Sequence, residues 1–129
     1  MVILIDFDGT CVAHEYPAIG KDIGAVPVLK KLVATGHKLI LWTMRSGPEL
    51  LEAIMWFESN RIELYAANHN PTQKHWTTSP KAHGDLCIDD INLGIPLIYP
   101  GNDRPYVDWN KVEDLLIKKR LIGADLKVS

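Results

Sequence analysis

Short apolar runs alternate along this chain with segments in which apolar residues recur at helical spacing. Runs such as VILIDF and HKLILWT are continuous, which is the pattern of strands whose two faces are both covered in a parallel sheet. Helical spacing is present at 23–36, 46–60 and 109–123. The apolar runs predict strands at 2–7, 37–43, 62–68, 84–90 and 95–100.

The alternating order of strands and helices is typical of an α/β fold, in which right-handed crossovers align parallel strands in one sheet. We therefore expect a three-layer, Rossmann-like fold with a central parallel sheet of about five strands. A chain of 129 residues, 47% of them hydrophobic, suffices for one compact domain, and no change of composition marks a second. Residues 1–129 are expected to form a single domain.

Composition and charge exclude some classes of function but do not identify one. The formal net charge is −2, and the lysines and arginines are scattered along the chain rather than grouped into a basic face. Both features disfavour nucleic acid as a partner. No run approaches the roughly 20 apolar residues of a membrane span, and no targeting segment is recognisable. Cys11 and Cys87 lack the spacing of a zinc site or a redox pair, so we expect reduced thiols and a cytoplasmic protein.

Polar side chains end four of the predicted strands, and ligands of parallel α/β sheets bind beyond the carboxyl ends of strands. These side chains are Asp6, Asp8, Thr43, Arg45, Asn68, His69, Asp89 and Asp90. Carboxylates gathered in one crevice repel one another unless a cation lies among them, and Mg²⁺ favours such oxygen ligands. With Lys81 as a further positive charge, the set is suited to a phosphoryl group.

Four sequence features occur in order along the chain: DFDGT at 6–10, Thr43 in LILWTMR, Lys81 in SPKAHGD, and the acidic pair in CIDD. Together they resemble the four motifs of the haloacid dehalogenase (HAD) superfamily of phosphatases and phosphotransferases. The resemblance extends over residues 2–98. The D-x-D-G-T motif carries most of its specificity, because a lone threonine or lysine would be a weak signal.

The resemblance implies a role for each matching residue. Asp6 is the expected nucleophile and would form an aspartyl-phosphate, since a carboxylate is ionised at neutral pH without help from a base. Asp8 is expected to protonate the leaving oxygen and then to deprotonate the attacking water. Thr43 and Lys81 would hold the phosphoryl oxygens.

The remaining implied roles concern the substrate and the metal. Asp89 would bind Mg²⁺ directly, and Asp90 would either bind it through water or orient Lys81. Arg45 is expected to contact a substrate anion, because its strand position aims it at the crevice. The expected substrate-binding residues are Gly9, Thr10, Met44 and Arg45. The expected metal ligands are Asp6, Asp8 through its backbone carbonyl, Asp89 and Asp90.

HAD enzymes often recognise substrates with an inserted cap domain, and this chain has no room for one. Residues 11–21 and 68–80 are long enough for loops only, so these two loops are the candidate specificity elements. They offer His14, Glu15 and Tyr16 on one side, and His69, Lys74, His75 and Trp76 on the other. An open crevice further implies either a large substrate or a homo-oligomer that completes the site.

The function expected from these residues is a Mg²⁺-dependent phosphomonoester hydrolase that acts on a phosphorylated small molecule. A phosphotransferase or phosphomutase would use the same aspartyl-phosphate, and the sequence does not separate the two. A phospho-accepting receiver-like module or a non-catalytic phospho-ligand binding module also stays open.

Overall fold

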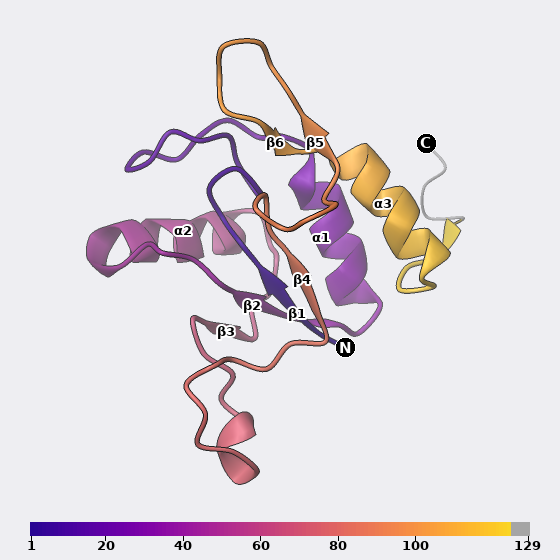
Figure 1. Ribbon diagram of the computed structural model, residues 1–129. Coiled ribbons are helices and arrows are strands. Elements are labelled where there is room, and N and C mark those ends of the chain that lie inside the picture. The colour runs from indigo at the N-terminus through magenta and orange to yellow at the C-terminus, as the bar shows by residue number, and fades with distance from the viewer. Residues whose placement is uncertain (125–129) are drawn as a thin grey trace.

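The protein is an α/β structure built on a parallel β-sheet (Figure 1). The computed structural model describes residues 1–124. Within that range the parallel sheet has four strands in the order β3-β2-β1-β4. They are β1 (Val2–Ile5), β2 (Lys38–Leu41), β3 (Ala66–Ala67) and β4 (Leu86–Ile88). The predicted α/β class is confirmed, and the arrangement is consistent with a Rossmann-like fold.

Helices flank this sheet: α1 (Ala25–Ala34), α2 (Gly47–Ser59) and α3 (Trp109–Lys118). α1 and α3 lie side by side, joined by a hydrogen bond of 2.6 Å from Lys31 Nζ to Glu113 Oε2. The chain leaves α1 through Gly36, whose φ of +97° is unfavourable for residues with a side chain. No helix within residues 1–124 has the length and apolar character needed to cross a membrane.

The predicted fifth strand does not join the parallel sheet, so the expectation of about five strands is corrected to four within the described residues. The run at 95–100 instead contributes β5 (Leu97–Ile98), which pairs antiparallel with β6 (Tyr106–Val107). A parallel neighbour needs a crossover of about a dozen residues or more, and residues 89–96 are too few to provide one. The connection at residues 99–105 instead returns the chain, so that β6 pairs with β5.

Alternation along the first strand fixes where the functional side chains point. Ile3, Ile5 and Phe7 are fully buried in the core, and the Phe7 ring lies 5.5 Å from the ring of Trp56 in an edge-on contact. Successive side chains of an extended segment point to opposite sides. The aspartates on either side of Phe7 therefore point away from this core cluster.

Candidate functional site

The turn that follows β1 is stabilised by its own backbone. The Asp6 N–H donates to the Ile88 carbonyl at 3.0 Å, which extends the pairing of β1 with β4. The Thr10 N–H donates to the Phe7 carbonyl at 3.1 Å, and Gly9 between them has a φ of +80°. A side chain at that φ is strained, so the turn requires the glycine of the D-x-D-G-T motif.

Thr10 connects this turn to the end of β4. Its hydroxyl donates to Asp6 Oδ2 at 2.8 Å and accepts from the Asp90 N–H at 3.0 Å. Its carbonyl accepts from the indole Nε1 of Trp109 at 2.7 Å. Thr10 is fully buried, so it holds the loops after β1 and β4 together from behind rather than facing a substrate.

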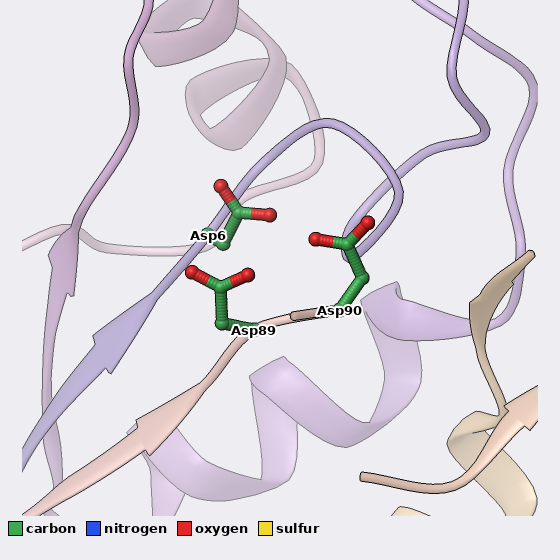
Figure 2. Close-up of side chains that lie close together, drawn as sticks. All are labelled: Asp6, Asp89 and Asp90. Carbon is green, nitrogen blue, oxygen red and sulfur yellow. The ribbon is translucent and has the colours of Figure 1, made fainter. Parts of the chain in front are cut away.

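Three carboxylates converge where β1 and β4 end (Figure 2). One oxygen from each of Asp6, Asp89 and Asp90 lies within 4.8 Å of the other two. Burial, followed by the charge of Asp89, raises the pKa of Asp6 to about 8, although the Thr10 hydroxyl partly opposes this. Burial also raises the pKa of Asp89 above its usual value, and Asp90 adds to the effect.

This cluster fits a hard divalent cation. Three carboxylates from two adjacent strands supply oxygen ligands on one side and leave the other side open for water or a substrate oxygen. Burial, followed by the negative charges of Asp89 and Asp90, disfavours the ionised form of Asp6 and raises its pKa. A bound cation would remove that repulsion, and the residues present therefore suit Mg²⁺.

His14, in the loop after β1, contacts the Asp90 carboxylate. The Nε2 of His14 lies 2.8 Å from Asp90 Oδ2, and both side chains are largely buried. Gly9 lies directly beneath this pair, and a Cβ at that position would collide with the His14 ring and the Asp90 carboxylate. Gly9 is thus required for close packing as well as for its backbone conformation.

Asp8 is paired with Arg45 and lies apart from the three-carboxylate cluster. Arg45 donates from Nε to Asp8 Oδ2 at 2.8 Å and from Nη2 to Asp8 Oδ1 at 2.9 Å. The Arg45 side chain is 1% exposed, and its hydrogen bonds with Asp8 raise its pKa further. Arg45 therefore serves as a counter-charge for Asp8, and the expectation that it contacts a substrate anion does not fit its buried, fully engaged guanidinium.

The carboxylates face an open cavity of about 520 Å³ at the carboxyl edge of the sheet. Of the predicted site residues, those that line it are Asp6, Asp8, Thr43, Met44, Arg45, Asp89 and Asp90. The Thr43 hydroxyl oxygen accepts from the Arg45 N–H at 3.1 Å, which leaves its own hydrogen for a ligand. Met44, Tyr16 and Ile91, which are 99%, 60% and 82% exposed, form an apolar rim.

The structure does not bring Lys81 to this cavity. Lys81 is exposed and belongs to the long segment between β3 and β4, whose short helix η1 (Gln73–His75) projects away from the sheet in Figure 1. Gln73 anchors the segment by donating to the carbonyls of Ser79 and Lys81 at 3.1 and 2.9 Å.

Arg104 lines the cavity and was missed by the sequence analysis. It is exposed and lies in the connection between β5 and β6. Of the lysines and arginines in the described part of the chain, Arg45 and Arg104 line the cavity, and Arg45 is already paired. The signal for Arg104 is the sequence NDRP, which is rich in turn-forming residues. It indicates a hairpin connection only if residues 95–100 are not assigned to the parallel sheet.

The fold and the site together define an α/β protein with a carboxylate-lined cavity at the carboxyl edge of a parallel sheet. No family model and no curated protein matches the chain. A solved structure does: a conserved protein coded by a locus from Bacteroides thetaiotaomicron, 41% identical, with a TM-score of 0.76. The match covers 100% of this chain and 98% of that one, so this protein belongs to the same family. The description of that relative names no activity.

Proposed function

We propose that this protein is a Mg²⁺-dependent phosphomonoester hydrolase of the HAD type, with the capless three-layer arrangement of that superfamily. The observation that carries the proposal is the convergence of Asp6, Asp89 and Asp90 within 4.8 Å, with the second aspartate of D-x-D-G-T on the wall of the same cavity. A cytoplasmic location is part of the same proposal, because the free thiols of Cys11 and Cys87 favour a reducing compartment.

Asp6, Asp89 and Asp90 would hold the metal through carboxylate oxygens, together with the Asp8 backbone carbonyl. Mg²⁺ at this position supplies positive charge that offsets both the carboxylates and the phosphate oxygens. It would also favour the ionised form of Asp6, which is the form that attacks phosphorus.

The chain's own residues then carry the reaction. An Asp6 carboxylate oxygen bonds to phosphorus as the bond between phosphorus and the ester oxygen breaks, and Asp8 gives its proton to that departing oxygen. Asp8 next takes a proton from a water molecule, whose oxygen attacks the aspartyl-phosphate. The bond between phosphorus and Asp6 breaks, and inorganic phosphate leaves with both residues restored.

Contacts to the phosphoryl oxygens come from Thr43 and from Arg104. Thr43 has a hydroxyl hydrogen to donate, and Arg104 is a cation at the cavity with an exposed guanidinium. Lys81 has no part in this proposal, because it lies outside the cavity. The substrate is a phosphorylated small molecule whose leaving group meets the rim of Tyr16, Met44 and Ile91.

The test is release of inorganic phosphate from a panel of phosphate monoesters, with excess Mg²⁺ and with EDTA. We expect turnover that EDTA abolishes and Mg²⁺ restores, and a loss of about 1,000-fold or more in Asp6→Asn. The exposed Asp22→Asn is the matched control and should retain wild-type turnover. Turnover that survives both EDTA and Asp6→Asn would contradict the proposal. Phosphate appearing on a second alcohol instead of in solution would identify a phosphotransferase.

A further inference from the structure

Arg45 is a buried cation whose hydrogen bonds all go to groups of the protein. A guanidinium has five N–H donors. Two go to the two oxygens of Asp8, at 2.8 and 2.9 Å. The other three go to the carbonyls of Pro17, Glu49 and Ala18, at 3.2, 3.3 and 2.8 Å. No donor is left for a substrate.

Two of those carbonyls belong to the loop that follows the D-x-D-G-T turn. Arg45 thus joins Asp8 to Pro17 and Ala18, and through Glu49 it also joins them to the first turn of α2. A paired fork of N–H groups fixes the plane and direction of a carboxylate, which a single contact does not do. Each Asp8 oxygen has a second lone pair that these hydrogen bonds do not use.

The same guanidinium also lies over two aromatic rings. Its Cζ lies 5.0 Å from the ring centroid of Phe7 and 5.1 Å from that of Tyr16. Phe7 is fully buried, whereas Tyr16 is 60% exposed and lines the cavity. Arg45 therefore contacts the same aromatic ring that a bound leaving group would meet.

We propose that Arg45 is a positioning residue that couples the loop 14–18 to Asp8, so that the residues contacting the leaving group and the residue protonating it form one rigid unit. This inference rests on the proposed phosphatase function. Because this enzyme would lack a cap domain, the coupling would give the loop 14–18 part of the substrate recognition that a cap domain provides in other HAD enzymes. Substrate orientation by Tyr16 and proton delivery by Asp8 are then set by the same side chain.

A double-mutant cycle tests the coupling. Wild type, Arg45→Met, Asp8→Asn and the double variant are assayed for kcat and KM on glycerol phosphate, a poor leaving group, and on nitrophenyl phosphate, an activated one. Arg45→Met is expected to lower kcat about 100-fold on glycerol phosphate and about tenfold or less on nitrophenyl phosphate, since an activated leaving group needs little protonation. In the Asp8→Asn background the same change should cost about threefold or less.

A matched control and a second variant keep the test decisive. Lys30→Met removes an exposed cation on α1 and should leave all four parameters at wild-type values. If Arg45→Met fails to fold by circular dichroism, Tyr16→Ala replaces it. Its expected signature is a raised KM together with a kcat loss that is larger for glycerol phosphate than for nitrophenyl phosphate.

The outcomes separate the two proposals. A wild-type enzyme that releases no phosphate from any ester would contradict the proposed function. A wild-type enzyme that turns over, with equal losses for Arg45→Met in both backgrounds or on both esters, would overturn the positioning role alone. For the Tyr16→Ala substitute, a loss confined to KM would do the same.

Discussion

Thr10 illustrates how one small side chain holds two strand ends at the spacing that the site needs. Its hydroxyl is both a donor to Asp6 and an acceptor from the Asp90 N–H, and it has no exposed surface. The contact thereby sets the relative position of two of the three clustered carboxylates. The sequence predicts that Thr10 binds substrate, whereas its side chain is fully buried behind the carboxylates.

We predict that Thr10→Val destabilises the protein by about 1–3 kcal/mol, because it keeps the shape of threonine but leaves the partly buried Asp90 N–H without an acceptor. Thr10→Ser keeps the hydroxyl and loses one methyl group, which costs about 1 kcal/mol. Urea unfolding monitored by tryptophan fluorescence provides the comparison. Hydrogen bonding at this position would be unimportant if the valine variant proved the more stable of the two.

At the scale of elements, the hairpin of β5 and β6 brings a cationic side chain to the cavity. The HAD resemblance had placed the cation of the site on a different segment, the one between β3 and β4. Arg104 lies in its connection and lines the cavity, whereas Lys81 lies on the long excursion between β3 and β4. The hairpin is anchored by the Val107 N–H, which donates to the Gly9 carbonyl at 3.0 Å. Its position is therefore tied to the D-x-D-G-T turn itself.

We predict that Arg104→Ala lowers kcat/KM for phosphate monoesters about tenfold, the loss expected for one exposed contact to a phosphate oxygen. Lys81→Ala should change kcat/KM by less than about twofold, since it removes an exposed charge outside the cavity. Steady-state kinetics on one substrate, with both variants measured in parallel, decides between them. A larger loss for Lys81→Ala would restore the role that the HAD resemblance gave it.

The strand ends of the site were predictable because parallel strands deliver their carboxyl ends to one edge of the sheet. This geometry brings Asp6, Asp89 and Asp90 to the same edge, and the order of apolar runs was enough to predict that much. The partners of Arg45 were not predictable, because they depend on the path of an irregular loop. The place of Lys81 depends likewise on how Gln73 anchors the segment after β3.

Strand lengths were overestimated for a related reason. Residues 62–68 were expected to form a strand, yet β3 is only Ala66–Ala67. Arg61, just before that stretch, has a φ of +58°, and Ile62 bonds back to the Phe57 carbonyl at the end of α2. Ile62, the first apolar residue of the run, thus completes the turn after α2 and does not extend the sheet.

Over the whole molecule, the formal net charge is only −2, yet three carboxylates meet at one edge of the sheet. The consequence for stability follows from Asp6, whose pKa in the folded protein is raised from its ordinary 3.8 to about 8. Below the ordinary value the group is protonated in both folded and unfolded chains. Between the two values the folded protein keeps a proton that the unfolded chain releases, so stability falls as pH rises.

We predict that the metal-free protein loses stability steadily from about pH 5 to about pH 8, at no more than about 1.4 kcal/mol per pH unit for this group. Mg²⁺ in 100-fold excess over its dissociation constant should add about 2.7 kcal/mol, and more at the upper end of the range, where fewer protons compete for the carboxylates. Urea midpoints in EDTA and in Mg²⁺ measure both effects.

Asp6→Asn should flatten the EDTA profile, because an amide does not titrate and can donate a hydrogen bond to Asp89. The prediction would be contradicted if the stability of wild type and of Asp6→Asn changed in parallel with pH and Mg²⁺ stabilised neither protein at any pH. That result would show that the cluster neither holds a proton nor binds the ion.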